Sequence, residues 1–109
     1  MAISARDSLD AFKTAIHDGN IGPLKDMLAD DFIFENTECE QDGKATILTR
    51  MAAGGFSVGD WVVYHEDDNV ICGTHSLTPT GGPKVSMMYF AKFEAEKCVF
   101  WKVHLYKPA

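Results

Sequence analysis

The spacing of apolar residues changes once along the chain, and this change constrains the fold more than any other feature. In the first half, apolar side chains recur at helical spacing, as they do from Leu9 through Phe12 to Ile16. From Trp61 onward, apolar and polar residues alternate in runs that are rich in β-branched and aromatic side chains. Helices followed by hairpins predict an α+β domain in which helices cover one face of a curved antiparallel sheet.

Local end signals divide the first half into three helices and a short strand. Ser4 followed by Asp7 resembles a capping box, so the first helix is expected over Ala5–Asp18, before Gly19. Pro23 suits the first turn of a second, short helix. The other expected elements are a strand at Phe32–Phe34 and a third helix, capped by Asp42, that carries Ile47, Leu48 and Met51 and ends at Gly54-Gly55.

Turn-forming residues divide the second half into four strands. Asp67-Asp68, the Pro79–Pro83 segment and Glu94–Glu96 separate them. The expected strands are Trp61–His65, Val70–Thr78, Lys84–Phe93 and Lys97–Tyr106. Short loops between successive strands predict a four-strand antiparallel meander. At 109 residues, the chain is expected to form a single domain, residues 1–109.

Charge and composition exclude several classes of function. Ten basic and 16 acidic residues give a net charge of −6, and no two Lys or Arg residues are adjacent, so nucleic-acid binding is not expected. No apolar run approaches the ~20 residues that span a bilayer. The first residues also lack the apolar stretch of a signal peptide, so a soluble, cytoplasmic protein is expected. Cys39, Cys72 and Cys98 are widely spaced, which favours reduced thiols over disulfides or a zinc site.

Facing residues in a hairpin have a constant index sum, so each loop fixes which side chains share a face of the sheet. The simplest registers pair Tyr89 with Trp101, Met87 with Val103, His75 with Met87, Gly73 with Tyr89, Tyr64 with Ile71, and Val62 with Gly73. The face that these residues form is mostly apolar, and we assign it to the helices and the core. The opposite face is polar except for a cluster of Met88, Phe90 and Phe100, which predicts a partner surface.

Several short segments, taken in their order and spacing, resemble one group of proteins. They are Asp18-Gly19-Asn20, the spaced Leu24 and Leu28, Ala29-Asp30-Asp31, Glu35-Asn36, Asp42-Gly43-Lys44 and the closing run Lys97–Lys102. Together they resemble the SnoaL-like and ketosteroid-isomerase branch of the nuclear-transport-factor-two-like superfamily. The resemblance implies a cystatin-like cone of curved sheet closed by three helices, an apolar pocket at its wide end, and a homodimer formed through the outer sheet face.

The same resemblance implies which positions would carry chemistry. In ketosteroid isomerases a tyrosine on the first helix and an acidic residue on the last-but-one strand form an oxyanion hole, and an aspartate after the first strand moves the proton. These roles fall on Phe12, Tyr89 and Asn36. Phe12 has no hydroxyl and Asn36 is not a base at neutral pH, so this route of proton abstraction is not expected. The aspartate of related epoxide hydrolases and cyclases falls on Val103.

His75 and Tyr89 are the candidate catalytic residues. His75 is the only histidine that the expected register points into the cavity, and an imidazole can act as a base because it titrates near pH ~6.5. Tyr89 can donate a hydrogen bond to a ligand carbonyl. The residues expected to enclose a small, mainly apolar ligand with one or two polar groups are Phe12, Asn36, Tyr64, Met87, Trp101 and Val103. Neither a metal nor a cofactor is expected.

Each candidate also has a purely structural interpretation. His75 could be a hydrogen-bonded pocket histidine, Asn36 a turn residue, and the tyrosines and Trp101 ordinary core side chains. Two functions therefore remain open. One is an enzymatic pocket, with isomerisation, cyclisation or dehydration as the expected chemistry. The other is a non-catalytic module for ligand binding or for dimerisation through Met88, Phe90 and Phe100.

Overall fold

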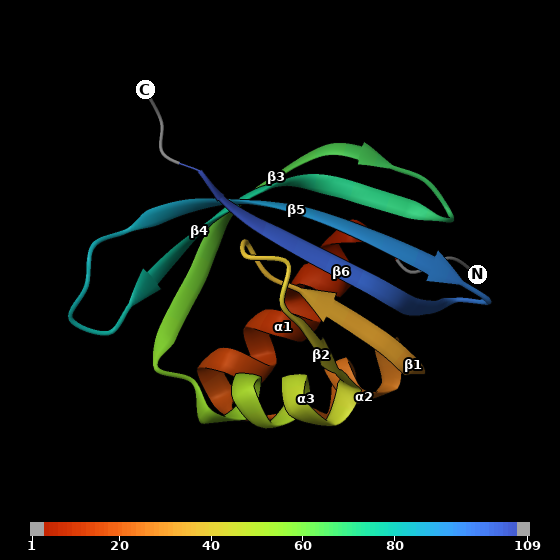
Figure 1. Cartoon of the computed structure of the whole chain (residues 1–109), viewed down its shortest axis with the longest axis horizontal. Coiled ribbons are helices and arrows are strands. Elements are labelled where there is room, and N and C mark those ends of the chain that lie inside the picture. The colour runs from red at the N-terminus through yellow and green to blue at the C-terminus, as the bar shows by residue number, and fades with distance from the viewer. Residues whose placement is uncertain (1–3, 107–109) are drawn as a thin grey trace.

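The computed structural model describes residues 4–106 and shows one curved sheet with three helices packed against its concave face (Figure 1). This arrangement is the α+β architecture that the sequence predicts. The elements, in chain order, are α1 (Ala5–Asp18), α2 (Gly22–Met27), β1 (Leu28–Glu35), β2 (Gln41–Gly43), α3 (Lys44–Ala53), β3 (Phe56–Glu66), β4 (Val70–Pro79), β5 (Val85–Glu94) and β6 (Lys97–Tyr106).

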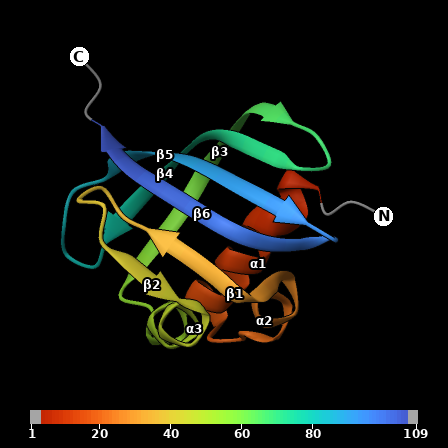
Figure 2. The same ribbon diagram turned by 45° about the vertical axis from the view of Figure 1, so that its right-hand side comes forward.

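The sheet has six strands, in the order β2-β1-β6-β5-β4-β3. The four-strand meander that the sequence predicts is therefore present, but β1 and β2 extend the sheet beyond it. β1 lies beside β6 and runs parallel to it (Figure 2). The sequence underestimates β1, which begins at Leu28 and not at Phe32. A register shift between Leu28 and Ile33 interrupts the alternation there, and the partner strand lies at the other end of the chain. Local periodicity cannot show either feature.

The ends of α1 follow the local signals in the sequence. The N-cap of α3 lies one residue later than predicted. The Ser4 hydroxyl accepts a hydrogen bond from the Asp7 N–H at 3.0 Å, and α1 ends before Gly19, whose φ is 70°. The predicted bounds of this helix are therefore confirmed. α3 is preceded by Gly43 at its N-cap, and the Asp42 side chain makes no cap. Asp42 lies instead on β2.

The inner face of β4, of β5 and of β6 from Phe100 onward contains the side chains that the sequence assigns to it. His75 pairs with Met87 as predicted. The β5–β6 register is shifted by two residues, so that Tyr89 pairs with Val103 rather than with Trp101. A two-residue turn and a register shift beside Phe93 cause this difference. Because side chains alternate with period two, this even shift leaves the β6 residues from Phe100 onward on their predicted face, whereas the odd shift beside Phe93 turns Cys98 toward the core.

Two bulges in β3 overturn the register predicted for the β3–β4 hairpin. Ile71 pairs with Glu66 rather than with Tyr64, and Tyr64 is the extra residue of one bulge. The other bulge contains Asp60, with a φ of 52°, and Trp61. As a result the Tyr64 side chain is 69% exposed, and Trp61 packs against the core in its place. Each bulge adds a residue that index counting cannot detect.

The core lies between the helices and the concave face of the sheet, and all three helices and most strands contribute buried side chains to it. Cys39, Cys72 and Cys98 are free thiols. Within residues 4–106, no helix is both long enough and apolar enough to cross a membrane.

Candidate functional site

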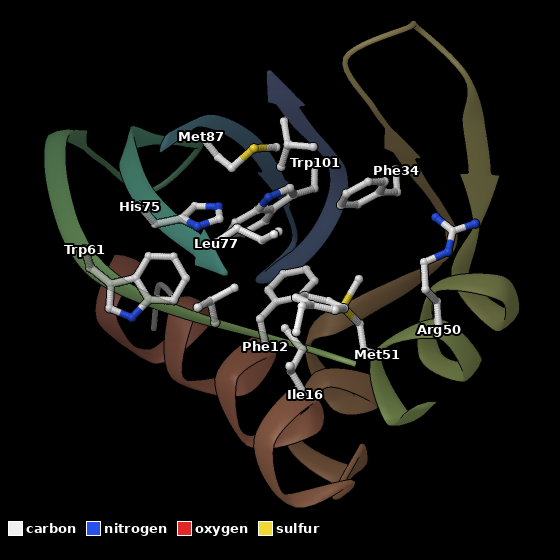
Figure 3. Close-up of a pocket in the computed structure, with 13 residues that line it drawn as sticks. Phe12, Ile16, Phe34, Arg50, Met51, Trp61, His75, Leu77, Met87 and Trp101 are labelled. Atoms are coloured by element: carbon white, nitrogen blue, oxygen red, sulfur yellow. The ribbon is translucent and has the colours of Figure 1, made fainter. Parts of the chain in front are cut away.

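A cavity of about 260 Å³ lies between α1, α3 and the concave face of the sheet. Its walls are almost entirely apolar, and Figure 3 shows the side chains that enclose it (Figure 3). The lining residues are Phe12, Ile16, Phe34, Arg50, Met51, Phe56, Val58, Trp61, His75, Leu77, Met87, Trp101 and Val103. The sheet curves away from the helices here, so the layers do not close on each other and a space for a ligand remains.

Aromatic rings form one wall of the cavity and extend behind it. The rings of Phe12 and Trp101 lie 4.6 Å apart, and Trp101 stacks on Tyr89 at 5.6 Å. The Trp61 ring lies 4.7 Å from the His75 imidazole. Rings at these separations hold one another in fixed orientations, so this wall has a defined shape before any ligand arrives.

His75 is the titratable side chain that the cavity holds most deeply. It lies on β4, is 8% exposed, and points into the cavity (Figure 3). Its Nδ1 lies 2.9 Å from the Ser76 carbonyl oxygen. A carbonyl oxygen only accepts hydrogen bonds, so Nδ1 carries the proton of the neutral ring and Nε2 has a free lone pair. Burial lowers the pKa of His75, which favours this neutral form.

Within residues 4–106, the hydrogen bond of the His75 ring is the one at Nδ1, and no partner lies at Nε2. The cavity therefore contains one neutral imidazole nitrogen that can accept a hydrogen bond or a proton from a bound molecule.

The Tyr89 hydroxyl is engaged by the protein backbone. It donates a hydrogen bond to the Val62 carbonyl at 3.2 Å, beside Gly73. The Tyr89 side chain is 2% exposed and lies behind the cavity wall, and burial raises its pKa to about 12. In this structure the hydroxyl holds the β3 bulge in place, so the predicted bond to a ligand carbonyl would require it to leave Val62.

Five of the eight residues predicted for the site do line the cavity. They are Phe12, His75, Met87, Trp101 and Val103. The structure does not bring Tyr64 or Asn36 to it. Tyr64 lies in a bulge and faces away, for the reason given above. Asn36 closes the β1–β2 loop, where its side-chain oxygen accepts hydrogen bonds from the Glu38 and Glu40 N–H groups, each at 3.0 Å.

Arg50 and Trp61 are lining residues that sequence reasoning missed. Trp61 reaches the cavity only because of the bulge at Asp60, for which the sequence has no clear signal. Arg50 lies on α3, three residues after Ile47 and one before Met51. This position at the edge of the apolar stripe could have indicated that Arg50 lies near the core. Its Nη2 lies 3.0 Å from the Asp42 carboxylate.

Potential metal ligands are sparse among the described residues of the site. Among residues 4–106, no group of three or more His, Cys, Asp or Glu side chains is placed to hold a metal ion. The cavity lining contains a single imidazole and no carboxylate or thiol.

The chain matches no family model and no curated protein sequence. Its structure is similar to an NTF2-like protein of unknown function from Cytophaga hutchinsonii, with 19% identity, a TM-score of 0.74, and coverage of 97% of this chain and 93% of the other. A candidate ketosteroid isomerase from Kribbella flavida matches with 16% identity, a TM-score of 0.70 and coverage of 96% and 78%. An LEH-like epoxide hydrolase of M. tuberculosis matches with 16% identity, a TM-score of 0.65 and coverage of 91% and 80%. The chain therefore has the NTF2-like fold.

Proposed function

We propose that this protein binds a small, mainly apolar molecule that donates one hydrogen bond to Nε2 of His75. The observation that supports this is an apolar cavity of about 260 Å³ lined by His75, whose ring is bonded at Nδ1 and has Nε2 left to accept from a ligand. A dry cavity of ~150 Å³ holds benzene, so this volume suits a ligand about the size of two fused rings. It lies just below the ~300 Å³ at which drug-sized pockets begin.

The chemistry that this site supports best is proton transfer. A neutral imidazole in a water-poor cavity can take a proton from the ligand and return it elsewhere on the same molecule, which is sufficient for an isomerisation or a dehydration. The ketosteroid-isomerase-like positions Phe12 and Asn36 cannot supply this chemistry, so His75 would be its base.

We place the chain in the SnoaL-like branch on the segments that resemble it. We also place it in a reducing, cytoplasmic setting, which its free thiols support.

The binding proposal can be tested with naphthalene and naphthol, which differ by one hydroxyl. We expect both to raise the melting temperature of the wild-type protein, and naphthol to bind about tenfold more tightly through its bond to His75. In His75→Phe, naphthol should bind no more tightly than naphthalene, because the acceptor is gone while most of the side-chain volume is retained. His65→Phe is the matched control, since His65 lies on the exposed β3–β4 hairpin. Failure of both compounds to stabilise the wild type would refute the proposal.

A second candidate function is homodimerisation through the outer face of the sheet. Val62, Thr74, Met88 and His104 form one row of paired residues across four strands. Val62 is 44% exposed and Met88 is 47% exposed, and the half-buried Phe90 follows two residues later on β5. Apolar side chains gathered on one face favour a partner of the same kind, because a two-fold axis places the same patch on both subunits.

Phe90→Lys tests the dimer. A charge in the centre of this patch is expected to convert the dimer into a monomer in sedimentation experiments, because the lysine would lose its water on association. Thr46→Lys adds the same charge at an exposed position on α3, away from the outer sheet face, and serves as the control for charge alone. An unchanged sedimentation coefficient in Phe90→Lys, or a wild type that is already a monomer, would rule out this interface.

A further inference from the structure

We propose that Arg50 forms an anion subsite at the mouth of the cavity, so that the natural ligand is an apolar molecule that carries a carboxylate. This inference rests on the proposed function, because it names the chemical class of the molecule that the cavity binds. It adds a second polar contact to the one at His75, on a different element of the fold.

Among the lining residues that the structure describes, Arg50 carries the only charged side chain. Figure 3 shows it beside Phe34 at one end of the lining, with Trp61 and His75 at the opposite end (Figure 3). Its side chain is 46% exposed, whereas His75 is 8% exposed. The guanidinium therefore lies where the cavity meets solvent, and the imidazole lies at its inner end.

The Arg50 guanidinium has more N–H donors than its ion pair with Asp42 uses. Nη2 lies 3.0 Å from Oδ2 of Asp42, and a guanidinium carries five N–H groups in a planar fork. Within residues 4–106, Asp42 is the one carboxylate paired with Arg50. Asp42 lies on β2 and is not part of the cavity lining. The unused N–H groups can thus receive a ligand carboxylate in the bidentate geometry that arginine favours.

The position of Arg50 also avoids the main cost of binding an anion. A carboxylate buried among the apolar walls would lose its hydration, which is strongly unfavourable. At the mouth it keeps part of its water and gains charge-assisted hydrogen bonds, while the apolar part of the molecule fills the cavity. The net charge of −6 opposes an anion only weakly, because salt screens charges beyond about 8 Å under physiological conditions.

Naphthylacetate and naphthylacetamide test this inference, since they have the same shape and differ in charge. In titration calorimetry at low salt, we expect the wild type to bind the carboxylate about three- to tenfold more tightly than the amide. Arg50→Gln should abolish the preference, and Arg50→Lys should retain part of it. Asp42→Asn should increase it, because the competing carboxylate is gone. Arg6→Gln is the matched control, since it removes the same charge from an exposed position on α1.

The two proposals fail in different ways. If the amide binds and the carboxylate binds no better, the anion subsite is wrong and the apolar cavity of the proposed function stands. If neither compound binds, both proposals are wrong. A preference that persists in Arg50→Gln, or that survives a high salt concentration unchanged, would place the anion away from Arg50. The melting temperature of each variant without ligand shows whether that variant is folded. If Arg50→Gln does not fold, the carboxylate preferences of Arg50→Lys and Asp42→Asn test the anion subsite in its place.

Discussion

His75 is held neutral by its surroundings rather than by a charged partner. Burial among the cavity side chains lowers its pKa, while the bond from Nδ1 to the Ser76 carbonyl opposes this effect and is the smaller of the two. The backbone bond also fixes which nitrogen is free. A single residue thus acquires a defined tautomer and a defined direction from its position on β4.

This environment has a measurable effect on stability. The unfolded chain takes up a proton on His75 near its ordinary pKa of 6.5, whereas the folded chain does so only at lower pH. The free energy of unfolding should therefore be highest above pH 6.5 and fall as the pH decreases below that value. Urea denaturation between about pH 5 and pH 8 measures it. In His75→Gln the fall should be smaller than in the wild type, and identical profiles for the two proteins would contradict this explanation.

At the scale of elements, the bulges of β3 decide the shape of the site. The Val62 carbonyl turns inward at this strand and accepts the Tyr89 hydroxyl, and Gly73 leaves room for both. A Cβ at position 73 would lie 1.8 Å from the Val62 oxygen and 2.8 Å from the Tyr89 oxygen. Strands β3, β4 and β5 are therefore joined here by one close contact as well as by their ladder.

We expect Gly73→Ala to destabilise the protein by about 2 to 4 kcal/mol, because the β3 backbone must move away and Tyr89 loses its acceptor. Gly59→Ala is the control within the same pair of strands. Its Cβ would lie 3.8 Å from the Ser76 hydroxyl, an ordinary contact, and we expect a change below about 0.5 kcal/mol. Chemical denaturation compares the two. Equal effects would show that the close contact at Gly73 is unimportant.

At the scale of the whole molecule, the fold leaves a space that its own side chains do not fill. A chain with only 109 residues has a small core, and an empty apolar volume of about 260 Å³ removes packing contacts from it. A space of this kind is consistent with selection for binding at the expense of stability.

A side chain that fills the cavity should increase the stability of the protein and weaken ligand binding. Val103→Phe adds apolar volume at a half-buried lining position, and we expect the free energy of unfolding to rise by about 1 kcal/mol while naphthol binding weakens at least tenfold. Val63→Phe, at a position that is 43% exposed and outside the cavity, should change neither quantity appreciably. Unchanged naphthol affinity in Val103→Phe would show that the compound binds elsewhere. Thermal denaturation and calorimetry provide the two measurements.

The parts of the fold that could be predicted depend on neighbours in the sequence. The bounds of α1 are set by Ser4 and Gly19, which act on the helix directly beside them. The pairing of His75 with Met87 follows from alternation on either side of one loop. Trp101 and Val103 reached their predicted face although their register was wrong, because the error was an even number of residues.

The parts that could not be predicted depend on distant neighbours. β1 is extended by its parallel pairing with β6, and Trp61 replaces Tyr64 on the inner face through bulges that β4 and β5 accommodate. Arg50 becomes part of the site only because α3 packs where the sheet opens.

The amino-acid pattern alone determined the fold class, the inner face of three strands, and the imidazole on that face, since periodicity and end signals act over a few residues. Tertiary structure decided that the space beneath the sheet is hollow, which rings line it, and that a guanidinium lies at its mouth. Those features arise where strands bend and layers separate, and the energy of a bend depends on side chains that the chain brings together only when it folds.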